Sequence, residues 1–87
     1  MKIKLTKMQR EELPGFIQGF IGDNKDHDSI RERVASQIEE SSVIELTEDE
    51  RSIIEMDVLT AIDIADGNDD EWAGIKRSLT SLAAKLA

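Results

Sequence analysis

The sequence contains no cysteine and no tyrosine, and it has one histidine, one tryptophan and one proline. Without cysteine, neither a disulfide framework nor a thiolate metal site can form, which is typical of proteins in the reducing cytoplasm. The lone His27 has no nucleophile or metal-ligating partner at a recognisable spacing, so we interpret it as a turn or cap residue rather than a general base. We therefore expect a cytoplasmic protein that is not an enzyme and uses no cofactor.

Long apolar runs are also missing from the sequence. No stretch approaches the roughly 18 apolar residues that a membrane-spanning helix needs. The N-terminal segment MKIKLTKMQREEL has no apolar run after its lysines, so we do not expect a secretory signal. With 87 residues the chain can form one domain with a modest core. We predict a single acidic domain over residues 1–87 that does not interact with membranes.

Two acidic turns invite a comparison with calcium-binding loops, and both lack the residues that such loops need. GDNKDHD at 22–28 and DGNDDE at 66–71 carry side-chain oxygens at alternate positions. An EF-hand loop also needs a glycine at its sharp turn and a closing glutamate, and neither segment has them at the required positions. Capping and the helix dipole explain these acids, so we expect no metal site.

Positive charge is scarce in the middle of the chain. Residues 39–71 hold thirteen Asp and Glu against one Arg, which gives −12, whereas residues 1–38 carry +1 and residues 72–87 carry +3, for a net charge of −8. Such a field repels a phosphate backbone and attracts a basic protein. We therefore expect a basic protein partner and no direct nucleic-acid binding. The alternative is that the acid serves only solubility.

The chain matches itself at an offset of 41 residues. In this alignment KIKLT at 2–6 lies over VIELT at 43–47, followed by Gln9 over Glu50 and Arg10 over Arg51. Each copy has an extended segment and then a capping box, in which a threonine and the Gln or Glu three residues later bond each other's amides. An acidic turn and a second helix follow in each copy. We predict two helical hairpins related by duplication, over residues 2–41 and 43–86.

The predicted fold class is all-α, with four short helices near residues 7–21, 28–40, 48–66 and 70–86. The segments 2–5 and 43–46 alternate apolar and polar residues, so an antiparallel pairing would give a minimal two-stranded β-ribbon about a pseudo-twofold axis. The alternative is that both segments are extended linkers whose Ile and Leu side chains enter the core. Trp72, at the start of the last helix, is expected to close one end of the core.

The helix at 48–66 is predicted to be mostly buried, with one acidic side facing water. At about 100° per residue its apolar residues share one arc. These residues are Ile54, Val58, Ala61, Ile62 and Ala65, flanked by Ile53 and Ile64. The sector left free holds Glu48, Glu55, Asp63 and Asp66 around Leu59, a set that we call the acidic stripe. Gly67 is expected to end the helix.

The helix at 7–21 is predicted to be the weakest of the four. Pro14 removes an amide and clashes with the preceding turn, so we expect a kink or break near Leu13. Gly15, Gly19 and Gly22 fall on the side opposite the apolar residues, where the backbone of a second copy could approach closely. They form the candidate self-association face. The alternative is that they only loosen a surface helix.

The absence of catalytic signals leaves a non-enzymatic protein interaction module as the predicted function. We hypothesise a small inhibitor or adaptor that docks the acidic stripe on a basic protein, for example one that binds nucleic acid, by imitating the charge of that nucleic acid. The alternative is a homo-oligomeric accessory protein, such as a homodimer. The LTxxER helix start and the DGNDDEW turn resemble those of small phage-encoded proteins, and no motif identifies a family.

Overall fold

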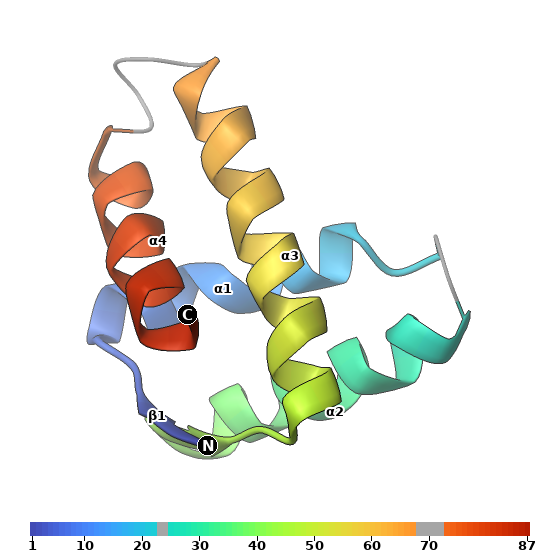
Figure 1. The fold of residues 1–87 in the computed structure, drawn as a ribbon. Helices are drawn as coiled ribbons and strands as arrows, with labels where there is room; N and C mark the ends of the chain where they lie inside the picture. The colour runs from blue at the N-terminus through green and yellow to red at the C-terminus, as the bar shows by residue number, and fades with distance from the viewer. Residues whose placement is uncertain (23–24, 68–72) are drawn as a thin grey trace.

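In the computed structural model, which describes residues 1–22, 25–67 and 73–87, a short strand precedes each of two pairs of helices (Figure 1). The first half contains β1 (Lys2–Lys4), α1 (Lys7–Gly19) and α2 (Lys25–Glu40). The second half repeats this order with β2 (Val43–Glu45), α3 (Glu48–Asp66) and α4 (Ala73–Leu86). The predicted all-α class with a minimal ribbon is confirmed. Within the described ranges, no helix is long and apolar enough to cross a membrane.

The β-ribbon forms, and it is centred on equivalent residues of the two halves. β1 and β2 pair antiparallel, with Ile3 opposite Ile44. The amide of Leu5 donates to the carbonyl of Ser42 at 2.7 Å, and the amide of Leu46 donates to that of Met1 at 2.8 Å. The two donors are 41 residues apart and so are the two acceptors. A pseudo-twofold axis through the ribbon therefore relates one bond to the other. The predicted ribbon is confirmed in place of unpaired linkers, and Ile3 and Ile44, which pair in it, are also buried in the core.

Both capping boxes form with the same geometry. Thr6 and Thr47 have φ of −71° with ψ of 164° and 168°, and each Oγ1 accepts from the amide three residues on. The side chains of Gln9 and Glu50 accept in return from the amides of Thr6 and Thr47, at 3.0 and 2.8 Å. The first helix of each repeat therefore begins where the sequence predicts.

The side chains that close these boxes also join the two repeats. Gln9 Nε2 donates to the carbonyl of Ser78 on α4 at 2.9 Å, and Glu50 Oε2 accepts a hydrogen bond from Arg33 on α2. Ser78 and Arg33 are 45 residues apart, four more than the offset of 41 that relates the first helices. Each first helix is thus bonded at its start to the second helix of the other repeat.

Equivalent arginines follow the boxes and reach the second helix of their own repeat. Arg10 Nε donates to the carbonyl of Ile38 at 2.8 Å, and Arg10 Nη2 donates to that of Glu39 at 2.9 Å. Arg51 Nη1 donates to the carbonyl of Leu86 at 2.8 Å. The last carbonyls of a helix have no partner within it and carry partial negative charge, so a guanidinium there stabilises the helix end.

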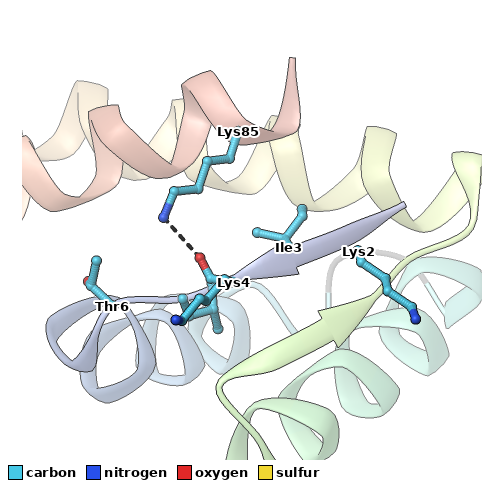
Figure 2. Close-up of a pocket in the computed structure, with 6 residues that line it drawn as sticks. Lys2, Ile3, Lys4, Thr6 and Lys85 are labelled. Carbon is cyan, nitrogen blue, oxygen red and sulfur yellow. Dashed lines mark hydrogen bonds between the residues drawn. The ribbon is translucent and has the colours of Figure 1, made fainter.

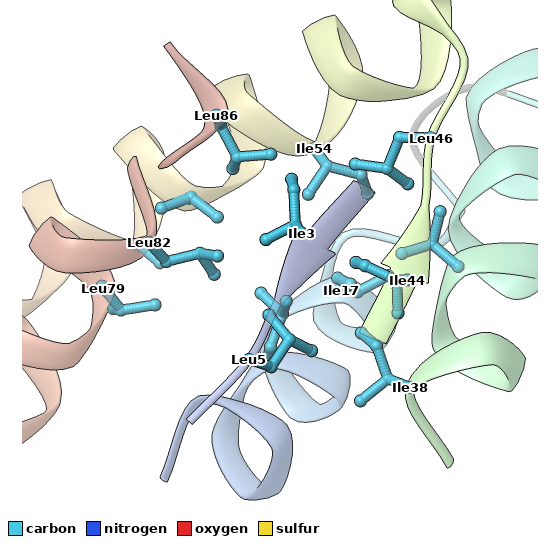
Figure 3. Close-up of a cluster of buried hydrophobic side chains, with 14 residues drawn as sticks. Ile3, Leu5, Ile17, Ile38, Ile44, Leu46, Ile54, Leu79, Leu82 and Leu86 are labelled. Atoms are coloured by element: carbon cyan, nitrogen blue, oxygen red, sulfur yellow. The ribbon is translucent and has the colours of Figure 1, made fainter. Parts of the chain in front are cut away.

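One hydrophobic core is shared by the two repeats (Figure 3). Each helix buries a stripe at helical spacing, and the ribbon adds the inward-facing side chains of both strands. Fully buried members include Leu13, Ile17, Val34, Ile38, Ile44, Ile54, Val58, Leu79, Leu82 and Leu86. Trp72, which we expected to close one end of this core, lies outside the described residues.

A buried ion pair that sequence reasoning missed ties α2 to α3. Arg31 and Asp57 are each 3% exposed, and the guanidinium donates to both carboxylate oxygens, from Nε at 2.8 Å and from Nη2 at 2.9 Å. Arg31 Nη1 also donates to the carbonyl of Phe20 at 2.9 Å. The hydrogen bond with Asp57 raises the pKa of Arg31 above its ordinary value. Both charged groups are therefore satisfied inside the protein.

Two local expectations are corrected. The break near Leu13 is wrong, because α1 continues through Pro14, with Leu13 and Ile17 fully buried on either side. Their burial offsets the cost of about 3 kcal/mol that an interior proline carries. Ile64, placed at the flank of the apolar arc of α3, is 45% exposed. It lies on the same side of α3 as Asp57, two turns further on, beyond the point where Arg31 of α2 covers that side.

Candidate protein-binding face of helix α3

The acidic stripe lies along the outer side of α3, where the structure leaves the helix open to solvent. Glu48, Asp63 and Asp66 are exposed, and Glu55 is half-buried. Leu59, in the middle of the stripe, is 49% exposed and does not belong to the core cluster. The structure therefore brings the five predicted residues onto one helix face. The four carboxylates among them differ in whether a cation of this protein already pairs with them.

Arg51 partly neutralises the N-terminal end of the stripe. It donates to Glu48 Oε1 from Nε at 3.0 Å and from Nη2 at 2.5 Å, and to Glu55 Oε2 from Nη1 at 3.2 Å. The hydrogen bond from Arg51 lowers the pKa of the Glu48 carboxyl and raises the pKa of Arg51. Glu48 and Glu55 therefore share one cation, and reversing either charge would also disturb Arg51.

The C-terminal end of the stripe is tied to α4. Asp66 forms an ion pair with Lys76, and both side chains are about half exposed. An exposed pair of this kind contributes little to stability, commonly about 0 to 1 kcal/mol, but it occupies the carboxylate. A partner would have to compete with Lys76 for Asp66.

The middle of the stripe differs from its two ends in the pairing of its carboxylate. Among the described residues, no ion pair or hydrogen bond involves the side chain of Asp63. Met56, two turns before Asp63 on the same face, is 47% exposed and was not predicted as part of the site. Its spacing of three residues from Leu59 was the available signal. Met56, Leu59 and Asp63 together give an apolar centre with a free carboxylate beside it.

The glycine face predicted on α1 is only partly assembled. Gly15 and Gly19 lie on the exposed side of α1, and a Cβ built at either would meet no atom within 4 Å. Gly22 lies beyond the end of the helix with a φ of 111°, a conformation that favours glycine, and its amide donates to the carboxylate of Asp28. Gly22 therefore has a local role in the turn, and the close-approach surface is reduced to two residues.

The described part of the chain contains no group of three or more His, Asp or Glu side chains that could hold a metal ion. His27 lies half-buried in the first turn of α2. Residues 23–24 and 68–71 of the two acidic turns lie outside the described ranges.

No protein-family model, curated protein or solved structure matches this chain. Any functional conclusion therefore depends on the geometry and charge of the described residues.

Proposed function

We propose that the protein is a non-enzymatic interaction module, an inhibitor or adaptor, that docks the acidic stripe of α3 on a basic protein partner. Nucleic-acid-binding proteins are the fitting class of partner, because their basic grooves already accept a row of negative charges. We place the protein in the cytoplasm, since it has no cysteine.

The observation that carries the proposal is the pair of half-exposed apolar side chains inside the stripe. Met56 and Leu59 are 47% and 49% exposed on a helix whose other large apolar residues mostly face the core. Interfaces concentrate binding energy in a few apolar anchors that a polar rim surrounds. The surrounding acids would steer a basic partner and fix its orientation. A stripe that served solubility alone would not need Met56 and Leu59 at its centre.

Capture from a lysate of the source cell tests the proposal, with the protein immobilised as bait and the bound proteins quantified by mass spectrometry. The informative variant is Asp63→Lys, because Asp63 can be reversed without disturbing Arg51. Glu32→Lys is the matched control, since it makes the same change of charge at an exposed position of α2. We expect the wild type and Glu32→Lys to retain one basic protein that Asp63→Lys loses by about tenfold or more.

Raised salt provides the second part of the test. Attraction between exposed charges weakens as the Debye length falls from about 10 Å at 0.1 M to about 3 Å at 1 M, so the captured amount should fall with salt. Equal capture by Asp63→Lys and Glu32→Lys would show that the stripe is a solvated surface.

Self-association remains the second candidate function, favoured by the open surface at Gly15 and Gly19. A hollow of about 300 Å³ lies between α1 and α4, and it is lined by Gly15 together with Glu12, Phe16 and Ile75. A homo-oligomer would show a molecular mass that rises with protein concentration and changes little with salt. Replacement of Gly15 by leucine would then restore the monomer, whereas Asp63→Lys would not.

A further inference from the structure

The outer edge of β1 borders a hollow whose lining contains no residue of the acidic stripe. The hollow has a volume of about 540 Å³ and is lined by Lys2, Ile3, Lys4, Leu5, Thr6 and Lys85. Figure 2 shows Lys85 reaching from α4 to the carbonyl of Lys4, with Lys2 further along the same strand. Three cationic side chains therefore gather at one strand edge of a protein whose net charge is −8.

The register of the ribbon turns the backbone of Lys2 and Lys4 toward this hollow. Two residues before Ile3, Met1 is bonded to Leu46, and two residues after it, Leu5 is bonded to Ser42. Hydrogen-bonded pairs recur at every second residue of an antiparallel ladder, so Ile3 and Ile44 form such a pair as well. The intervening Lys2 and Lys4 then direct their amides and carbonyls away from β2. Within the described ranges, only the Lys4 carbonyl among these four groups has a bond, from Lys85 Nζ at 2.9 Å.

The outer edge of β2 differs, because its amides are already used. The amide of Glu45 donates to Gln37 Oε1 and that of Val43 donates to Ser41 Oγ, both at 3.1 Å. Side chains from the end of the first repeat therefore occupy the amides of this edge, while the edge of β1 stays open over Lys2. The two edges of a nearly symmetric ribbon are thus not equivalent.

We propose that the outer edge of β1 binds an extended acidic peptide segment of another protein, which adds a third strand to the ribbon. Peptide residues opposite Lys2 and Lys4 would place their side chains on the same solvent face as these lysines, where Asp or Glu would pair with them. The residue between them would point toward the floor formed by Ile3 and Leu5. The fitting sequence is therefore an apolar residue between two acids. Lys85 would release the Lys4 carbonyl to the peptide amide and turn to a peptide carboxylate.

A peptide fits this edge better than the other anionic or extended ligands. The backbone groups of Lys2 and Lys4 match a peptide backbone, and a nucleic-acid strand offers no such alternation of amides and carbonyls. A long phosphate polymer would also meet the acid of residues 39–71. No residue of the acidic stripe lines the hollow, so this inference does not depend on the function proposed for α3. A protein with both sites would be an adaptor.

The test uses the intact protein and a labelled peptide in which glutamate and valine alternate, with binding followed by fluorescence anisotropy. A second peptide carries N-methyl groups on the amides of one edge, which removes those hydrogen bonds and keeps every charge. We expect N-methylation to weaken binding by about tenfold or more, the effect of losing about two backbone hydrogen bonds. This comparison uses only the wild type, so it does not depend on the folding of a variant.

Two variants locate the site. Lys85→Glu should weaken binding of the unmodified peptide by about tenfold. Lys25→Glu, the same change at an exposed position of α2, should alter binding by less than about twofold.

Equal binding of the two peptides would show attraction by charge without strand addition. No measurable binding would show that Lys85 and the short strand only protect the edge. A wild-type dimer that Lys85→Glu dissociates would assign the edge to a second copy. Each of these three results overturns the proposal.

Discussion

At the scale of the residue, the feature that most changes the interpretation of the sequence is a charge inside the protein. Helical periodicity placed Glu48, Glu55, Asp63 and Asp66 on the open side of α3 and made no prediction for the burial of Asp57 and Glu50, which are each 3% exposed. Both are buried because a cation from α2 meets them, Arg31 in one case and Arg33 in the other. Spacing along one helix cannot reveal a partner on another, so neither pair could be predicted from the sequence.

The Arg31–Asp57 pair predicts a large cost for removing one partner. Asp57→Ala leaves a buried guanidinium without its two carboxylate bonds, so we expect the free energy of unfolding to fall by about 3 to 5 kcal/mol. Urea denaturation followed by circular dichroism measures this change. Asp63→Ala, which truncates an exposed aspartate of the same helix, should alter stability by less than about 0.5 kcal/mol.

A double variant separates the pair from its surroundings. Replacing Arg31 by methionine and Asp57 by leucine removes both charges, and the loss should be well below the sum of the two single losses. Additive losses would mean that the two side chains stabilise the protein independently, contrary to the geometry.

At the scale of the element, local signals predicted most of what forms. The starts of α1 and α3 were predicted within one residue, because each capping box is complete within four consecutive residues and both boxes form. The end of α1 was placed two residues too late, at 21 instead of Gly19. The break predicted near Leu13 does not occur, because packing against other elements buries Leu13 and Ile17 on either side of Pro14. Local sequence does not show that packing.

The caps predict matched losses of stability in the two repeats. Thr6→Ala and Thr47→Ala should each lower the free energy of unfolding by about 0.5 to 2 kcal/mol, because each removes one acceptor of a helix amide. Thr60 and Thr80 provide controls within helices, where each Oγ1 donates to the carbonyl four residues earlier. Their replacement by alanine should be neutral or stabilising by up to about 0.7 kcal/mol. Thermal melts in which the cap variants match these controls would contradict the role of the boxes.

At the scale of the whole molecule, the organising feature is the repeated order of strand, capping box and two helices, which the sequence predicts. The alignment at an offset of 41 predicted equivalent strands, boxes and helices, and the ribbon register and the inter-repeat bonds of Gln9 and Glu50 follow the same symmetry. The sequence could not predict which repeat would diverge. The open edge of β1 and the closed edge of β2 depend on Lys85 and Gln37, whose approach is a tertiary event.

The sequence predicted where the acidic stripe lies on α3, but it did not predict which of the carboxylates form ion pairs. Periodicity placed the acidic stripe on the open side of α3, since the apolar arc defines that side. The spacing of Arg51 from Glu48 and Glu55, three and four residues, could have predicted their pairing. The pair between Asp66 and Lys76 joins different helices and had no such signal. The structure thereby shifts the centre of the site toward Met56, Leu59 and Asp63.

The most direct test of the central claim measures stability and partner capture together for Leu59→Ala. Val43→Ala, which truncates an apolar side chain of similar exposure on β2, is the matched control. Because Leu59 is half exposed, we expect its truncation to lower the free energy of unfolding by less than about 1 kcal/mol, against about 2 to 5 kcal/mol for a buried leucine. Capture of the basic partner should be lost with Leu59→Ala and kept with Val43→Ala. A loss of several kcal/mol in stability, or full capture by Leu59→Ala, would contradict the assignment of α3 as the binding face.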